Sequence, residues 1–293
     1  MSKQDIPSFE EFLSLPAKDV AQLAPQTLIF AAGGTRRSAA LAGVATTGNE
    51  YASWAYKQMI ECFDLFFQYG VKYIITHAII PNQYNEVTNK YREKLFEWVD
   101  WVLAGPEQMQ NYQRRGWNVR LLGTEHTPQV AHVAQRLREI QAPEGAPTLC
   151  FTITTSEEAL WESMLTAVVK SSAKTQADAI RAYYGEDIPP VEMYISCCKP
   201  GFFPAILPPF LMGNVQCYWA LRPGFITDPN KILELLYDYA YVRKTWQPDK
   251  TGRAEMALEH QSVWEKAPTL GLGMRLGPFW YPRPIEHPGS SDS

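Results

Sequence analysis

Six short apolar runs, separated by longer amphipathic segments, constrain the fold of this chain more than any other feature. The runs cover residues 27–32, 71–79, 118–123, 147–153, 191–196 and 215–221. Between them, apolar residues recur at helical spacing, which predicts helices over 50–69, 86–114, 128–140, 157–183 and 228–246. This alternation is typical of a mostly parallel sheet covered on both faces. We therefore expect an α/β fold in which a mostly parallel six-stranded sheet is flanked by helices.

No internal repeat and no linker-like segment interrupts this pattern. We expect a single domain over residues 1–280, with the C-terminal region packed against the sheet. The tail, residues 281–293, is rich in Pro and Ser and ends in small polar residues. Such a segment has little apolar surface to bury, and we expect it to be partly disordered.

Composition excludes several classes of protein. The net charge is −4, from 27 Lys and Arg against 31 Asp and Glu, so bulk electrostatics attract no nucleic acid. Acidic residues precede any apolar run at the N-terminus, which disfavours a signal peptide, and no stretch approaches the ~18 apolar residues of a membrane span. The five cysteines lack zinc-ligand spacing. These features predict a cytoplasmic protein with reduced thiols and no membrane span.

The first apolar run leads directly into the segment 33-GGTRRSAALAG-43. Glycines let backbone amides approach an anion, and Arg36 and Arg37 add fixed positive charge ahead of a helix. In parallel sheets, ligands bind beyond the carboxyl ends of the strands, where this segment lies. We therefore predict a diphosphate site made of Gly33, Gly34, Thr35, Arg36 and Arg37. A solvated loop is the competing interpretation, since the segment is neither a P-loop nor a GxGxxG motif.

Other polar residues that follow strands are weaker candidates. His77 lies in an apolar run and is typical of a core histidine, whereas Asn82, Gln83 and Glu86 follow the second run as loop residues. Glu125 and His126 follow the third run and could relay a proton. Serine-triad, glycosidase and zinc-protease chemistry lack their residue constellations. The aromatic content of 13% suits either an apolar pocket or a large core.

Several motifs together resemble a known family. They are SFEEFLSLP at 8–16, GTRR at 34–37, Tyr51, YYGE at 183–186 and LYDYAYVR at 236–243. From residue 27 to about 245 the chain is similar to cis-prenyltransferases. More closely, it resembles the tuberculosinol synthases and tuberculosinyl transferases, which are cis-prenyltransferase-like diterpene synthases.

This resemblance implies an activity and its site. The enzyme would ionise a bicyclic allylic C20 diphosphate, such as kolavenyl or tuberculosinyl diphosphate, and capture the cation with water to release a tertiary, clerodane-type alcohol. Tyr51, Arg36 and Arg37 would be catalytic, with Mg²⁺ as the cofactor. The sequence has no DxDD motif for protonating an alkene, so a separate class II diterpene cyclase would supply the substrate. The resemblance also allows a homodimer.

Two departures from the family pattern bear on this expectation. The tuberculosinol type has an Asp immediately before GTRR, where this chain has Gly33. Asn49 or Glu50, close by in the chain, would then supply the Mg²⁺ ligand. Chain-elongating relatives carry late arginines for a second diphosphate, but here 197-CCKPGFFPAILPPF-210 offers only Lys199. Chain elongation is therefore disfavoured, and this loop would form either an apolar wall for the substrate or an ordinary packed loop.

Two other functions remain open at this point. Without the family aspartate, the chain could be a catalytically silent partner subunit of an active cis-prenyltransferase. It could also transfer the prenyl group to a nucleoside or another small nucleophile. A silent subunit has no need of the two arginines in GTRR, whereas a transferase needs an acceptor pocket that the sequence does not identify.

Overall fold

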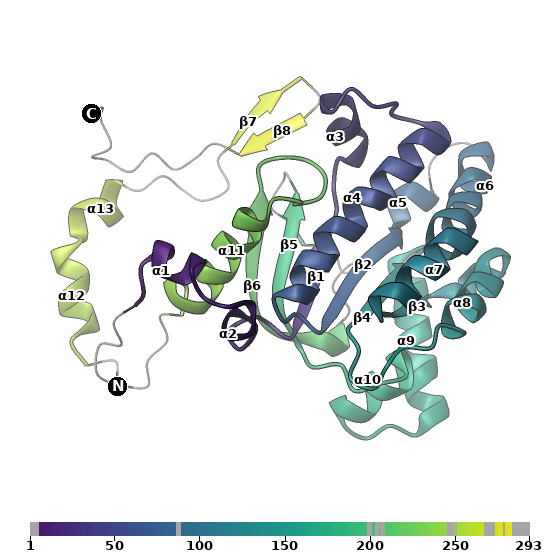
Figure 1. Cartoon of the computed structure of the whole chain (residues 1–293). Helices are drawn as coiled ribbons and strands as arrows, with labels where there is room; N and C mark the ends of the chain where they lie inside the picture. Colours follow the sequence, from purple (N-terminus) through teal and green to yellow (C-terminus); the bar gives the residue numbers. More distant parts are fainter. Residues whose placement is uncertain are drawn as a thin grey trace.

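The computed structural model describes residues 6–85, 89–197, 201–202, 205, 209–244, 249, 251–266, 273–277 and 279–282. Six strands form one sheet: β1 (Thr27–Ala31), β2 (Tyr73–Ile79), β3 (Asn118–Leu122), β4 (Thr148–Ile153), β5 (Val191–Cys197) and β6 (Met212–Ala220). Their order is β3-β4-β2-β1-β5-β6, and every neighbouring pair is parallel. The predicted six-stranded sheet is confirmed, with each strand within a few residues of its apolar run (Figure 1).

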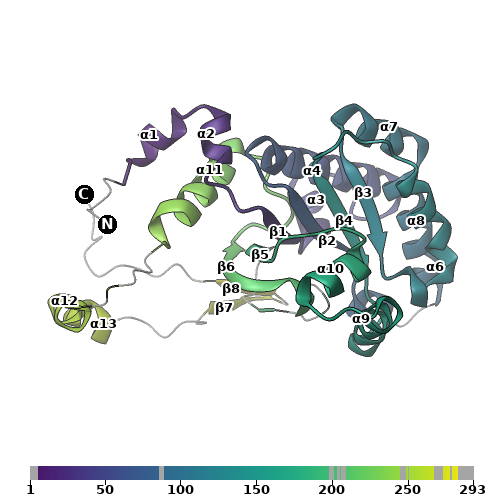
Figure 2. The same cartoon turned by 90° about the horizontal axis from the view of Figure 1, so that it is seen from below.

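The two faces of the sheet are covered by different helices (Figure 2). One face packs against α4 (Gly48–Gln68), α7 (Pro106–Arg115), α8 (Ala131–Arg138) and α11 (Pro229–Tyr237). The other face packs against α10 (Gln176–Tyr184), with α9 (Glu157–Ser171) beside it. Helix α4 buries Tyr51, Met59 and Phe63 along one stripe, as the apolar spacing predicts. Because both faces of the sheet are covered, every residue of β1 and β4 is buried, including Thr27, Thr148 and Thr152.

Two of the expected helices are each divided in the structure. The segment 86–114 contains α6 (Asn89–Trp98), a π-helical turn η1 (Val99–Leu103) and α7, which begins at Pro106. Proline cannot continue a preceding helix but suits the first position of a new one. The segment 157–183 is interrupted at Ser172, whose left-handed φ of 54° ends α9, and Thr175 caps α10. The expectation of single helices in these segments is wrong.

The ends of two further helices also differ from expectation. The segment 128–140 opens with a 3₁₀ turn, η3 (Pro128–Val130), before α8, and α11 continues as a π-helical turn, η5 (Asp238–Val242). Short helices that the apolar spacing does not predict are α1 (Phe9–Leu13), α2 (Ala17–Ala21), α3 (Thr35–Leu41), α5 (Pro81–Tyr84) and the 3₁₀ turns η2 (Thr124–His126) and η4 (Pro209–Leu211).

The C-terminal region divides into parts that behave differently. Helix α11 buries Ile232, Leu233 and Leu236 against the sheet, as expected. Helices α12 (Arg253–Glu259) and α13 (Gln261–Lys266) bury none of their residues, and they lie away from the sheet in Figure 1. The hairpin of β7 (Gly273–Leu276) and β8 (Phe279–Pro282) forms a separate antiparallel pair. Packing of the C-terminal region against the sheet therefore holds for α11 but not for α12 and α13.

The expected tail, residues 281–293, lies almost entirely outside the described residues, so its predicted disorder is not tested. Within the described part of the chain, no helix combines the length and the apolar character that crossing a membrane requires.

Candidate active site

The glycine–arginine corner, residues 33–37, follows β1 and turns the chain into α3. Gly34 has a left-handed φ of 69°, and a Cβ there would lie 2.5 Å from Arg37 Nη2 and 2.8 Å from Pro223 Cβ. Only glycine therefore fits at this position without displacing its neighbours. The Gly224 amide donates a 2.9 Å hydrogen bond to the Gly33 carbonyl, which fixes the corner against the loop after β6.

Thr35 and Tyr51 join the corner to the start of α4. The Thr35 Oγ1 and Tyr51 OH atoms form a 2.5 Å hydrogen bond in which either hydroxyl can donate. Tyr51 is buried, with 8% of its surface exposed. The sequence singled out both residues, and the structure brings them into direct contact. The hydroxyl of Tyr51 therefore lies at the glycine–arginine corner, although the residue belongs to the buried stripe of α4.

Arg36 makes the second link, to helix α6. Its Nη2 donates a 2.7 Å hydrogen bond to Tyr91 OH, and its guanidinium carbon lies 5.4 Å from the centre of the Tyr91 ring. Trp98 completes the connection, because its ring lies edge-on at 6.4 Å from both Tyr91 and Tyr51. These contacts connect five residues in turn: Arg36, Tyr91, Trp98, Tyr51 and Thr35. Thr35 and Arg36 are neighbours in the chain, so we call the set a closed circuit of polar and aromatic contacts.

Tyr91 and Trp98 are members of this circuit that the sequence reasoning missed. Both lie in a segment that reads as one more amphipathic helix, so their rings look like ordinary packing residues. A signal was present, since the two aromatic residues are seven positions apart and therefore share one face of a helix. Only the contact with Arg36 shows that this face meets the corner.

The relatives of the chain follow from comparison of its sequence and its fold. No protein-family model matches it. The chain is 43% identical over 277 residues to (+)-kolavelool synthase from Herpetosiphon aurantiacus, an alignment that covers 94% of this chain and 96% of that protein. The chain belongs to the cis-prenyltransferase-like diterpene synthases. The resemblance stated from its motifs is therefore confirmed.

Two solved structures share the fold at low sequence identity. Lavandulyl diphosphate synthase from Lavandula x intermedia, solved in complex with dimethylallyl diphosphate, is 13% identical with a TM-score of 0.53, covering 75% of this chain and 97% of that chain. A probable undecaprenyl diphosphate synthase from Campylobacter jejuni is 10% identical with a TM-score of 0.54, covering 76% and 98%. At these identities the similarity shows the cis-prenyltransferase fold.

The candidate metal ligands of this diterpene synthase, Asn49 and Glu50, could supply only part of the coordination shell of a divalent metal ion. Asn49 and Glu50 are exposed in the first turn of α4, next to Tyr51. Among the described residues, no group of three or more His, Cys, Asp or Glu side chains could hold a metal ion. One carboxylate and one amide suit Mg²⁺ only if water and substrate oxygens complete its six ligands. Their role as metal ligands stays a prediction.

His77 is more unusual than a packed core histidine. Burial lowers the pKa of its imidazole to about 4, against the opposing effect of a hydrogen bond with the Ala32 backbone. Part of the residue reaches the surface, yet its Nδ1 is enclosed and has no hydrogen-bond partner among the described residues. The burial and the hydrogen bond with the Ala32 backbone agree with the interpretation of His77 as a core histidine.

Of the other loop candidates after β2, the structure describes Asn82 and Gln83. The Gln83 side chain accepts a 3.1 Å hydrogen bond from the Ile80 amide and so caps α5. Asn82 is exposed. Glu86 lies outside the described residues, as do Cys198 and Lys199 in the loop that was expected to face the substrate.

Glu125 and His126 line a cleft of about 720 Å³ between η2, α9 and α10, which we call the Glu125–His126 cleft. His126 Nε2 lies 3.2 Å from Ser163 Oγ and 4.0 Å from Glu162 Oε2. Burial raises the pKa of Tyr183 in the same cleft, and the charge of Glu125 adds to this effect. The two residues thus meet other polar groups, as the sequence suggested, but on the face of the sheet that α10 covers.

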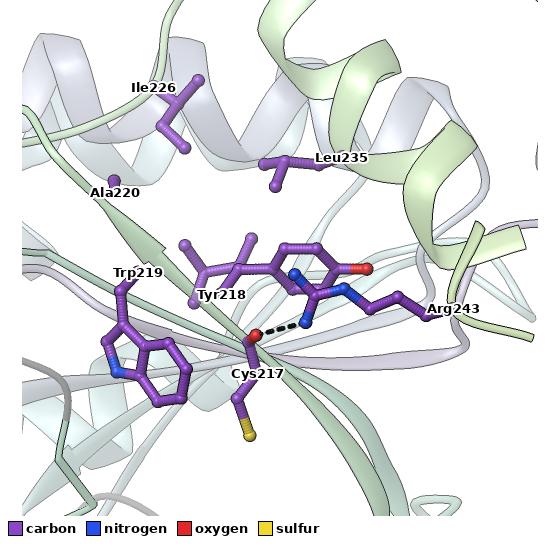
Figure 3. Close-up of a pocket in the computed structure, with 8 residues that line it drawn as sticks. Cys217, Tyr218, Trp219, Ala220, Ile226, Leu235 and Arg243 are labelled. Carbon is purple, nitrogen blue, oxygen red and sulfur yellow. Dashed lines mark hydrogen bonds between the residues drawn. The ribbon is translucent and has the colours of Figure 1, made fainter. Parts of the chain in front are cut away.

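A smaller cleft of about 270 Å³ lies between β6 and α11 (Figure 3). Ile226 and Leu235 line it, and Arg243 lies over the ring of Tyr218 at 4.0 Å. The Arg243 side chain also donates a 2.7 Å hydrogen bond to the Cys217 carbonyl and pairs with Asp238. The Arg243 guanidinium is therefore already paired with a carbonyl, a carboxylate and an aromatic ring at the edge strand β6.

Proposed function

We propose that the chain ionises a bicyclic allylic C20 diphosphate, such as kolavenyl or tuberculosinyl diphosphate, at the glycine–arginine corner. The cation would then be captured by water to give a tertiary, kolavelool-like diterpene alcohol and diphosphate. The observation that carries the proposal is the closed circuit in which Arg36 and Thr35 of the corner are tied to the aromatic residues Tyr91, Trp98 and Tyr51. These contacts place the Arg36 guanidinium, which can bind an anion, beside aromatic rings whose faces can stabilise a cation.

The corner supplies what loss of the diphosphate requires. As the carbon–oxygen bond breaks, negative charge grows on the leaving oxygens, and positioned cations stabilise it most. Arg36 is held by Tyr91, and Arg37 folds over Gly34 within the corner. Both guanidinium groups therefore need little reorganisation when the charge develops. Gly33, Gly34 and Thr35 allow the backbone to approach the same anion.

The aromatic part of the circuit supplies what the allylic cation requires. The faces of Tyr and Trp rings attract positive charge, and apolar surroundings keep water out. Tyr51 adds a hydroxyl that is already oriented by Thr35. In the proposed step one water oxygen bonds to the tertiary allylic carbon, and its proton passes to the released diphosphate. Tyr51 would orient that water.

Mg²⁺ is the proposed cofactor, with Glu50 and Asn49 as the side chains that would hold it. When bound, it would neutralise charge on the diphosphate oxygens. We also propose that a separate class II diterpene cyclase supplies the substrate. The same proposal places the protein in the cytoplasm.

The deciding experiment offers the purified protein a panel of linear and bicyclic C15 to C20 diphosphates, with and without Mg²⁺. Products are identified by gas chromatography and mass spectrometry. We expect a tertiary alcohol from one bicyclic C20 diphosphate and no elongated product with isopentenyl diphosphate. A prenylated nucleoside would favour the transferase alternative, and no turnover of any substrate would favour a silent subunit.

We also propose a homodimer. Large apolar side chains are exposed on β6, α12 and α13; they are Met212, Trp219, Met256, Leu258, Val263 and Trp264. Exposed apolar side chains of this size are common at protein interfaces. Sedimentation equilibrium should show a dimer, and Trp264→Glu with Leu258→Glu should weaken it.

A further inference from the structure

The Glu125–His126 cleft is separate from the glycine–arginine corner. It is bounded by η2, α9 and α10, and α10 packs against the face of the sheet opposite to α4. The corner is tied to α4 through the hydrogen bond between Thr35 and Tyr51. The described residues that line the cleft include no member of the closed circuit. A ligand of the cleft would therefore bind apart from any ligand of the corner.

The lining of the cleft is polar, and its two ends carry opposite charges. Glu125 and Glu162 lie beside His126 at one end, and Lys170 lies at the other. Lys170 follows Glu162 by eight positions along α9, which separates the two ends by about 12 Å along the helix axis. Within the described part of the chain, neither Glu125 nor Lys170 forms an ion pair. Both charges are therefore available to a ligand that spans the cleft.

Tyr183 gives the acidic end a fixed wall. Its ring packs edge-on against Tyr184 at 4.9 Å and against Phe210 at 6.4 Å. Its hydroxyl has no hydrogen-bond partner among the residues that the structure describes. An aromatic ring beside a carboxylate attracts an organic cation. Thr166 lies midway between the two ends, and its hydroxyl can both donate to and accept from an amide.

We propose that this cleft binds a short peptide-like zwitterion. Its protonated amine would lie between Glu125 and Glu162 beside the Tyr183 ring, its carboxylate would meet Lys170, and its amide groups would face Thr166. Three residues of extended peptide span about 10 Å, which matches the separation of the two ends once the long Glu and Lys side chains lean inward. The cleft volume of about 720 Å³ is in the usual range for small-ligand sites. The proposal does not depend on the reaction at the corner.

The test follows alanine methyl resonances of the full chain by NMR during titration with triglycine near neutral pH. Ala167 and Ala182 line the cleft, whereas Ala39 is buried in α3 beside the corner. Triglycine should shift the first two methyl resonances with a Kd below about 10 mM and leave that of Ala39 unchanged. N-acetyl-triglycine and triglycine amide each lack one terminal charge and should bind at least about threefold more weakly. Glycine is too short to reach both ends and should bind no better than the blocked peptides.

Two cleft variants assign the charges to the two ends of the peptide. Glu125→Gln should weaken triglycine binding by about threefold and leave the binding of N-acetyl-triglycine unchanged, because that peptide has no ammonium group. Lys170→Met should weaken triglycine binding by about as much and leave the binding of triglycine amide unchanged. Glu157→Gln and Lys174→Met are matched controls, because both residues are exposed near the ends of α9 and do not line the cleft.

Three results would each overturn the proposal: no shift at Ala167 and Ala182, equal affinity for triglycine and its blocked forms, or equal effects of the cleft variants and their controls. A shift at Ala39 instead would show that the peptide binds at the corner and would overturn it as well. The methyl spectrum of each variant shows whether it folds. If a variant does not fold, the comparison of triglycine with its blocked forms on the wild-type protein decides the proposal.

Discussion

The glycine–arginine corner and the Glu125–His126 cleft both follow strands of the same parallel sheet, yet they differ in charge and in surroundings. The corner follows β1 and brings Arg36 against the Tyr91 ring. The cleft follows β3 and brings Glu125 and Glu162 beside His126. Because the carboxyl ends of parallel strands share one edge, topology alone favours both places.

The contrast teaches that topology selects an edge of the sheet, whereas charge and aromatic lining decide which ligand each place on that edge would suit. A leaving diphosphate needs positive charge, and an allylic cation needs aromatic faces and no reactive anion nearby. The corner meets these requirements. The Glu125–His126 cleft is lined by the carboxylates of Glu125 and Glu162 and by a single lysine, Lys170. It therefore offers a diphosphate less net positive charge than the corner, and its carboxylates could trap a carbocation. The following predictions test this difference, from the largest expected effect to the smallest.

Arg36→Ala and Arg37→Ala should have the largest effects. A charge-assisted hydrogen bond contributes about 1.5 to 3 kcal/mol, which corresponds to roughly tenfold to a hundredfold in kcat/KM if it is made in the transition state. Arg36→Lys keeps the charge but loses the planar fork, and it should recover part of the loss. Steady-state kinetics measure this, with thermal melting as the control for folding. Wild-type rates in both alanine variants would place the site elsewhere.

Tyr51→Phe should reduce the rate by about two- to tenfold, because it removes one hydrogen bond of about 0.5 to 1.5 kcal/mol while the ring remains. It should also change the product ratio, since the captured water loses an orienting hydroxyl. Gas chromatography of the products separates the two effects. Thr35→Val removes the partner of that hydroxyl and serves as the matched variant. An unchanged rate and product ratio in Tyr51→Phe would remove the hydroxyl from the mechanism.

Glu50→Ala should weaken the response to Mg²⁺ by about two- to fivefold in the concentration that gives half-maximal rate, because Mg²⁺ keeps its water and phosphate ligands. Glu50→Gln and Asn49→Ala resolve which oxygen matters. The measurement is the rate as a function of free Mg²⁺ in a metal buffer. Full activity in excess chelator would contradict any role for the metal in turnover.

Glu125→Gln and His126→Gln should change turnover by less than about twofold, since surface substitutions away from the chemistry usually have small effects. These variants change polar side chains of the cleft, as Arg36→Ala changes one of the corner, so the effects of the two regions on turnover can be compared directly. A loss comparable to that of the arginine variants would show that the two regions act together.

Much of the fold could be predicted from the sequence because its signals are local. A strand buried on both faces is mostly apolar, so the mostly apolar runs that became β1, β4 and β5 indicated a central place in the sheet. The glycine–arginine corner was equally local, because Gly34 needs the left-handed backbone that only glycine adopts readily. Pro106 is a local signal for the start of α7, but the apolar spacing, which predicted one helix over 86–114, does not reveal this boundary.

What the tertiary structure decided depends on residues far apart in the chain. Ser172 ends α9 with a left-handed backbone, a conformation that the residue type serine does not predict. Tyr91 and Trp98 lie more than 50 positions from Arg36, yet Tyr91 is its hydrogen-bond partner at 2.7 Å. Helices α12 and α13 bury none of their residues against the described part of the chain. A sequence pattern records which residues can be buried or charged, but which groups meet is fixed only when the sheet brings distant segments together.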